Sequence, residues 1–198
     1  IDDLLRSPDY ADYFANKWAT VLRNKRRNAT DIPYTYKFHA WIRRAFRENM
    51  PYDQFVRSIL TATGDPETHP PVAWCREVKT STAQMEDVAQ LFLGMRMACA
   101  KCHHHPFERW TQDNYYGIAA AFARVGRKNS VDADEEVIFT QAGGEVTQPR
   151  TNKQMKVHLL LKGDVDVPAD QDRRAVFAQW LTSPENPFFA KSVTNRIW

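Results

Sequence analysis

The chain has 198 residues, of which 43% are hydrophobic and 26% are charged, and its formal net charge is +3. These values predict a soluble, globular chain of one large or two small domains, and no apolar run is long enough to cross a bilayer. The basic runs at residues 23–27 and 43–47 fit solvated helix faces, because no aromatic stacking pattern or DNA-reading motif accompanies them. We therefore expect no nucleic-acid partner.

The two ends of the chain are abrupt. Ile1 is preceded by neither an initiator Met nor a secretion signal, and Trp198 closes a predicted helix that lacks a Gly or Pro stop. We expect a fragment of a longer protein.

Three helices are predicted in the first part of the chain. Ser7 and Pro8 form a helix start, and apolar residues then recur at helical spacing to about Arg27. A second apolar stripe covers residues 38–46, and Pro51 opens a short third helix. Residues 61–73 are rich in Gly and Pro and are expected to form a loop.

A fourth helix is predicted from Ser81, which forms a capping box with Gln84. Its apolar stripe alternates spacings of three and four along Met85, Val88, Phe92, Met95, Cys99 and Cys102. This pattern predicts one continuous helix that delivers both cysteines to its buried side.

The second half of the chain changes character twice. Thr111 starts a helix that Gly126 ends, residues 136–168 suggest a small β-hairpin or irregular β insert, and helices resume near Arg173. The expected fold is mainly α, an irregular helical domain with a small β-hairpin insert. Its expected parts are a helical domain at 1–130, a β insert or linker at 131–170 and the truncated start of a second helical domain at 171–198.

The segment Cys99-Ala100-Lys101-Cys102-His103 has the C-x-x-C-H pattern of c-type haem attachment. Two thiols three residues apart can add to the two haem vinyl groups, and the imidazole that follows can reach the iron from the same side. The motif therefore predicts Cys99 and Cys102 as haem-binding residues and His103 as the proximal iron ligand.

Three other readings of the motif remain open. A thioredoxin-like dithiol is disfavoured because the cysteines come at the C-terminal end of a predicted helix. A zinc site would use Cys99, Cys102, His103 or His105, and the distant Cys75. The third reading is an unmodified cysteine pair beside a surface histidine run.

An opposite axial iron ligand must come from elsewhere in the chain. The sequence does not choose among Met50, Met155, His39, His69 and His158. His105 and Glu108 are candidates for a hydrogen-bonded shell around the proximal ligand, and ordinary loop contacts are the alternative.

The motif and its surroundings resemble the second planctomycete-specific cytochrome-type domain. The resemblance rests on C-A-K-C-H-H-H-P-F-E at 99–108 and W-T-Q-D-N-Y-Y at 110–116, and it extends upstream through L-L-R-S-P at 4–8, A-W-I-R-R-A-F at 40–46 and P-Y-D-Q-F-V at 51–56. Residues 178–198 are similar to the start of the planctomycete-specific domain that usually follows. The stretch between the third helix and the motif departs from the pattern, because it is shorter and contains prolines.

This resemblance implies haem c on Cys99, Cys102 and His103 in a large exported, periplasmic or extracytoplasmic protein. The function expected is electron transfer to or from a redox partner domain or protein. The alternative is a non-redox structural or polysaccharide-binding module whose Cys/His cluster binds zinc or no metal, and the six Trp residues would allow stacking on sugars. The sequence does not decide whether the chain is an enzyme.

Overall fold

The computed structural model describes residues 1–26, 29–129 and 136–198. The chain divides into two compact units. Unit 1 comprises Ile1–Glu77 and Arg127–Phe139, and unit 2 comprises Val78–Gly126 and Thr140–Trp198. The predicted domain boundaries at 130 and 170 remain predictions.

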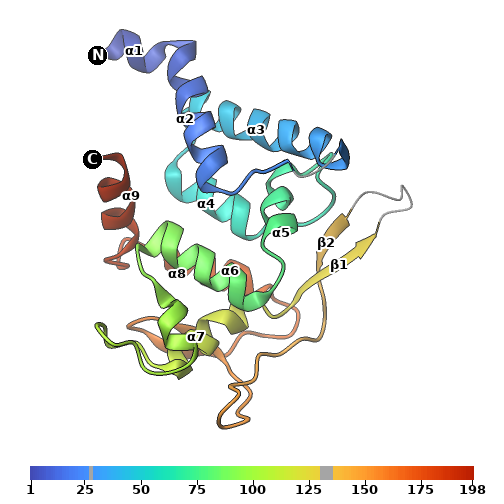
Figure 1. Ribbon diagram of the computed structural model, residues 1–198, viewed down its shortest axis with the longest axis vertical. Coiled ribbons are helices and arrows are strands. Elements are labelled where there is room, and N and C mark those ends of the chain that lie inside the picture. The colour runs from blue at the N-terminus through green and yellow to red at the C-terminus, as the bar shows by residue number, and fades with distance from the viewer. Residues whose placement is uncertain (27–28, 130–135) are drawn as a thin grey trace. The chain divides into compact units, whose positions relative to one another are not determined.

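The elements are mainly helical, as predicted (Figure 1). The α-helices are α1 (Asp2–Arg6), α2 (Pro8–Val21), α3 (Ile32–Arg47), α4 (Tyr52–Leu60), α5 (Ala73–Glu77), α6 (Ser81–Val88), α7 (Gln112–Ala119), α8 (Arg173–Leu181) and α9 (Phe189–Ile197). The strands are β1 (Val125–Asn129), β2 (Glu136–Thr140), β3 (Val157–Leu159) and β4 (Gly163–Val165). The described residues form two small two-stranded sheets, β1–β2 and β3–β4, where one hairpin was predicted.

Helices α2 and α3 of unit 1 pack against each other in antiparallel fashion. The predicted cap is confirmed, because the Ser7 hydroxyl accepts a hydrogen bond from Asp9 N at 3.1 Å. The predicted extension of this helix to about Arg27 is wrong, although Arg27 itself lies outside the described residues. Helix α2 ends at Val21 because Arg23 adopts a left-handed φ of 57° and reverses the chain.

Aromatic rings of α2, α3 and α4 form the core of unit 1. Phe46 of α3 stacks on Phe14 at 5.6 Å between ring centroids, and Phe55 of α4 lies 5.1 Å from Trp41 and 5.5 Å from Trp18. The apolar stripes at 38–46 and after Pro51 thus become the packed faces of α3 and α4, as predicted.

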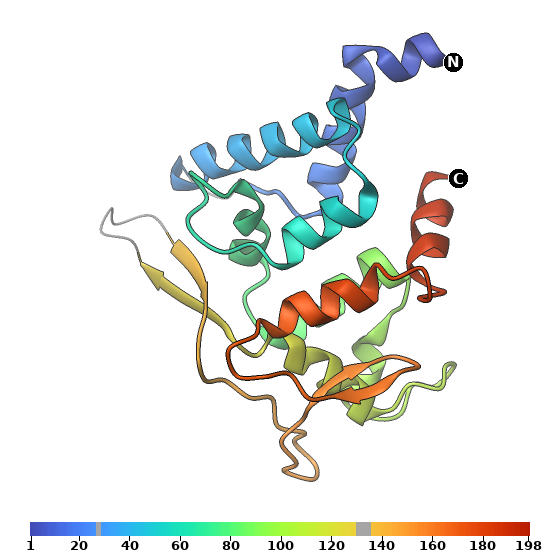
Figure 2. The ribbon, with the colours of Figure 1, turned by 180° about the vertical axis from the view of Figure 1, so that it is seen from behind.

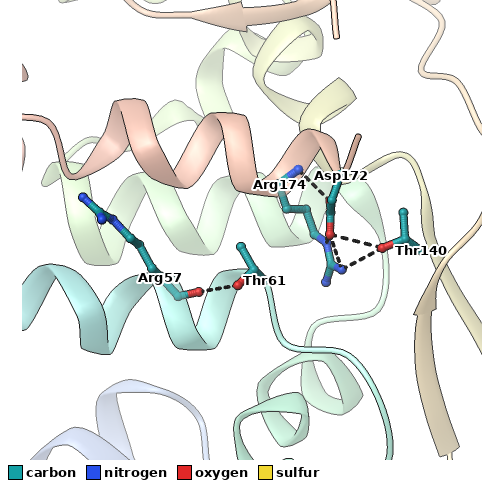
Figure 3. A network of polar contacts seen from close by, with 5 residues as sticks. All are labelled: Arg57, Thr61, Thr140, Asp172 and Arg174. Carbon is teal, nitrogen blue, oxygen red and sulfur yellow. Dashed lines mark hydrogen bonds and ion pairs between the residues drawn. The ribbon is translucent and has the colours of Figure 1, made fainter. Parts of the chain in front are cut away.

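The segment that follows α4 is non-helical as far as residue 69, and a 3₁₀ turn at Pro70–Val72 and α5 come next. Thr61 ends α4 by donating its hydroxyl to the Arg57 carbonyl at 2.9 Å (Figure 3). Gly64 pairs with Ile138 of β2 through two backbone hydrogen bonds of 2.7 and 2.9 Å. Strand β2 pairs with β1, a partner that the sequence pattern did not predict.

The single helix predicted from Ser81 to Cys102 is wrong. Its N-cap is Thr80 rather than Ser81, and α6 ends at Val88 in a π-helical turn, Ala89–Leu93. Gly94 then takes a left-handed φ of 70°, which ends the helix because Gly pays no steric cost there. Gly94 N and Met95 N both donate to Ala89 O, and the chain resumes in a 3₁₀ helix, Met97–Lys101.

Helix α7 and the β3–β4 hairpin are neighbours in unit 2, and α8 also contacts β3 (Figure 2). Thr111 caps α7 in a full capping box with Asn114, so the predicted helix start is confirmed. The α-helix stops at Ala119, and a 3₁₀ turn at Ala120–Phe122 and β1 occupy the residues predicted to remain helical up to Gly126.

The start of α8 is held by a buried ion pair. Asp172 caps the helix by accepting from Arg174 N at 2.8 Å, and it also receives Arg174 Nη2 at 2.7 Å (Figure 3). Arg174 is only 2% exposed, and Thr140 adds hydrogen bonds to both side chains. Asp172 is 23% exposed, and these hydrogen bonds offset part of the cost of removing the two charges from water.

Candidate functional site

The 3₁₀ helix Met97–Lys101 sets the orientation of the two motif cysteines. In a 3₁₀ helix, residues i and i+3 lie on the same side. Met97 and Ala100 are buried on one side, whereas Cys99 and Cys102 are both exposed. The prediction that the cysteines lie on a buried helical stripe is therefore wrong. Both thiols are accessible from solvent, and neither takes part in a disulfide.

His103 directly follows this helix, and its ring is exposed. Its Nδ1 lies 2.6 Å from the carbonyl oxygen of His104. Since a carbonyl can only accept, Nδ1 is the donor, and in the neutral ring Nε2 then carries the lone pair. This is the tautomer that a metal-binding histidine needs, because a ligating imidazole usually donates its other N–H to a carbonyl or carboxylate.

His105 organises the loop that follows the motif. Its Nε2 donates to the carbonyl of Arg96 at 3.2 Å, and its Nδ1 accepts from the backbone N–H groups of Phe107 and Glu108 at 3.2 and 3.0 Å. Its backbone N–H also donates to Trp110 O at 2.9 Å. Both ring nitrogens of His105 are therefore occupied by backbone groups, one before the motif and two in the loop after it.

Glu108 holds the other end of this loop by accepting from Trp110 Nε1 at 2.6 Å. Trp110 is buried and packs edge-on against Phe188 at 6.0 Å. The predicted role of His105 and Glu108 around a haem ligand stays a prediction. The contacts described for them join the residues of the loop to one another and to the Arg96 carbonyl.

Two side chains of helix α7 donate hydrogen bonds to the backbone of the motif. Gln112 Nε2 donates to the Lys101 carbonyl at 2.7 Å, and the Tyr116 hydroxyl donates to the same oxygen at 3.3 Å. Burial, followed by the nearby Cys102 thiol, raises the pKa of Tyr116. Neither Gln112 nor Tyr116 was predicted from the sequence to contact the motif. Their spacing of four on a well-capped helix does indicate that they lie on one face.

Tyr115 connects α7 to α6. Its hydroxyl donates to the carboxylate of Glu86, and its ring is fully buried. Burial, reinforced by this hydrogen bond, raises the pKa of Tyr115 well above the ordinary value. The neighbouring tyrosines therefore fix α7 to two elements, Tyr116 to the motif and Tyr115 to α6.

Two of the candidate opposite ligands, Met155 and His158, lie in the same unit as the motif, and the other three lie in unit 1. His158 donates Nδ1 to Asp164 at 2.7 Å and accepts at Nε2 from Asn114 at 2.9 Å. Met155 is buried in the core of unit 2. The choice of an opposite ligand stays a prediction.

The predicted zinc site lacks a preformed ligand set in the described part of the chain. Within residues 1–26, 29–129 and 136–198, no three His, Cys, Asp or Glu side chains converge on a point where a metal ion would fit. Cys75 is fully buried and belongs to unit 1, whereas Cys99 and Cys102 belong to unit 2. The residues of the motif fit haem attachment, because the thiols are free and exposed and His103 has the required tautomer.

Across the residues that the structure describes, every helix is too short or too polar to span a membrane. No curated protein matches the chain. No solved structure matches it either. Residues 1–127 match the model of the PSCyt2 family, described as a protein of unknown function (DUF1549), and the chain belongs to this family.

Proposed function

We propose that this chain is a c-type haem module in which Cys99 and Cys102 carry the haem and His103 is the proximal iron ligand. One observation carries the proposal: two free, exposed cysteines stand three residues apart, one in a 3₁₀ helix and one at its C-cap, and the next residue is a histidine whose Nδ1 donates to a carbonyl. Membership of a family that fits a planctomycete-specific cytochrome-type domain supports it.

The attachment chemistry follows from the residues. Each thiol adds across one vinyl group, so that an S–C bond forms, the S–H bond breaks and the hydrogen moves to the other vinyl carbon, with no net oxidation. His103 would hold the iron through Nε2. The bound group supplies an iron centre that changes oxidation state, and the chain contributes its attachment, orientation and polar surroundings.

The larger role is electron transfer to or from a redox partner within an exported protein. The two thiols and His103 are exposed, so an edge of the group would remain within reach of a partner domain. The resemblance at residues 178–198 to the start of a planctomycete-specific domain suggests that such a domain follows, and a periplasmic or extracytoplasmic location is part of this proposal.

The test is an absorption spectrum of the chain exported from a host with c-type maturation machinery. We expect a Soret band that stays with the polypeptide after acid–organic extraction. The double variant Cys99→Ala with Cys102→Ala removes both thioether bonds and should release the haem on extraction, whereas Cys75→Ala, a buried cysteine in unit 1, should keep it. A chain that loses all haem on extraction contradicts the proposal.

A second pair of variants tests the iron ligand. His103→Ala should permit attachment but alter the spectrum, while His104→Ala, the matched change at the next exposed imidazole, should leave the spectrum unchanged. Metal analysis of the same samples separates the alternative. Stoichiometric zinc without haem would support a non-redox structural or polysaccharide-binding module instead.

A further inference from the structure

Two buried glutamines link the C-x-x-C turn to a loop far away in the sequence. Gln112 is 5% exposed and Gln148 is 1% exposed. Gln148 Nε2 donates to Gln112 Oε1 at 3.1 Å and to Asp113 Oδ1 at 3.3 Å, and Gln112 Nε2 donates to the Lys101 carbonyl at 2.7 Å. A buried amide is costly unless its polar atoms are satisfied, so two in series call for a physical reason.

The backbone at both ends fixes the direction of this chain of hydrogen bonds. Lys101 O can only accept, so Gln112 must turn its NH₂ group toward it and its oxygen toward Gln148. At the other end, Gln148 Oε1 accepts from the N–H groups of Arg150 and Thr151 at 2.7 and 2.8 Å. Gln148 must therefore present its own NH₂ group to Gln112. No other arrangement of the two amides satisfies both ends.

The peptide unit held by this chain is the one that orients Cys102. Lys101 C=O and Cys102 N–H belong to a single planar group, so fixing the oxygen fixes the N–H and the start of Cys102. The N–H of the same peptide group points in the opposite direction, and it donates from Cys102 N to Cys99 O at 3.5 Å. This hydrogen bond closes the 3₁₀ turn between the two cysteines.

We propose that Gln148 is a positioning residue for the Cys99–Cys102 turn and that it acts through Gln112. As a statement about haem attachment, this inference rests on the proposed function. As a statement about the geometry of the turn, it stands independently. Gln148 lies outside the residues 1–127 that match the family, so the support of the site extends beyond the matched segment.

Gln148→Glu separates this role from a purely local one. The variant keeps an oxygen for Arg150 N and Thr151 N, but it replaces the NH₂ group with an oxygen that faces Gln112 Oε1. A rotated Gln112 would relieve that repulsion only by turning its oxygen against Lys101 O. In both cases the chain of hydrogen bonds from Gln148 to the motif is broken, and Gln112 no longer holds the Lys101 carbonyl as firmly.

The readout is amide hydrogen exchange at Cys102 in the full haem-free chain. We expect Gln148→Glu to speed exchange there about tenfold, the effect of losing one buried hydrogen bond. Gln179→Glu, the same change at an exposed position of α8, should leave it unchanged. In a Gln112→Met background, Gln148→Glu should speed exchange at Cys102 much less than it does alone, because the route through Gln112 is already lost and only repulsion from Asp113 remains.

Unchanged exchange at Cys102 in Gln148→Glu, or additive effects of the two substitutions, overturns the proposal. If the variants fail to fold, the unmodified chain supplies the test. The side-chain NH₂ protons of Gln112 and Gln148 should exchange far more slowly than those of Gln179, and equal rates would overturn the proposal. Since no step uses haem, a failure of the haem assignment is recognised separately by the absorption spectrum.

Discussion

The backbone of Gly117 on α7 lies against His158 on β3 so closely that a Cβ at residue 117 would come within 2.5 Å of the His158 Cβ. Side-chain contacts reinforce this approach, because the His158 ring is held between Asn114 of α7 and Asp164 of β4. Glycine at residue 117 therefore permits the hairpin to pack on the helix that supports the motif.

Gly117→Ala should lower the free energy of unfolding by roughly 1–3 kcal/mol, as expected for overpacking at a site that cannot yield. Urea denaturation measures the change. Gly143→Ala is the matched control, since a Cβ there meets nothing within 4 Å. Equal stability of the two variants would mean that α7 and β3 do not pack this closely.

Tyr115→Phe should change the response of the chain to alkaline pH. Burial and the hydrogen bond to Glu86 raise the pKa of Tyr115 in the folded chain. An unfolded tyrosine ionises near pH ~10, so this stabilisation is complete below that pH and is lost as the pH rises toward the higher folded pKa. The wild type should therefore lose more stability than Tyr115→Phe above pH ~10.

Denaturation midpoints measured at several alkaline pH values test this expectation. Tyr36→Phe is the control, because that ring is 65% exposed and lies in unit 1. The same pH dependence in wild type and Tyr115→Phe would show that the Tyr115 hydroxyl is not held as described.

Local signals in the sequence predicted the helix starts well and the helix ends less well. Ser7 and Thr111 cap helices because a side-chain oxygen and a nearby N–H are all that a cap requires. The prediction that the helix continues from α6 to Cys102 is wrong because Gly94 takes a left-handed φ, which ends the helix. The apolar residues on either side of Gly94 fit α-helical spacing and gave no sign of this. A spacing of three also fits a 3₁₀ helix, which turns Cys99 and Cys102 outward rather than inward.

The motif could be predicted from the sequence because its residues are contiguous. The residues that hydrogen-bond to its backbone could not. Gln112 and Gln148 are separated by 36 residues, and nothing in a single sequence shows that two amides of ordinary type meet in the interior. The pairing of β2 with β1 rather than with a later segment is likewise a choice made by tertiary contacts.

Glu145→Gln should destabilise unit 2 near neutral pH. The carboxylate receives both terminal nitrogens of Arg173 at 2.8 Å and Arg124 Nη2 at 3.0 Å. The two arginine side chains are 11% and 13% exposed, so removal of their shared charge leaves them poorly compensated. We expect a loss of about 1–3 kcal/mol, measured by urea denaturation.

The destabilisation caused by Glu145→Gln should depend on pH. The hydrogen bonds from Arg173, and then those from Arg124, hold the pKa of Glu145 below its usual value. The stabilisation is therefore present above the unfolded pKa and is lost as the pH falls through the folded pKa. The gap between wild type and Glu145→Gln should close in acid. Glu185→Gln, an exposed change in the same unit, should show no gap at any pH.

His105→Ala should open the loop after the motif without removing the proximal imidazole. The substitution leaves the N–H groups of Phe107 and Glu108 and the carbonyl of Arg96 without their shared partner. Because the loop is exposed, water replaces part of what is lost, and we expect a cost of about 1 kcal/mol. The local result should be faster proteolysis within residues 103–109 and altered fluorescence of Trp110, which is tied to Glu108.

His104→Ala removes an exposed imidazole from the same loop and leaves its backbone carbonyl to accept from His103, so proteolysis should not change. In haem-loaded chains, His105→Ala should retain the covalent group, since both ring nitrogens of His105 bind backbone groups. If His105→Ala instead produced the spectral change expected of His103→Ala, the assignment of His103 as the iron ligand would have to move to His105.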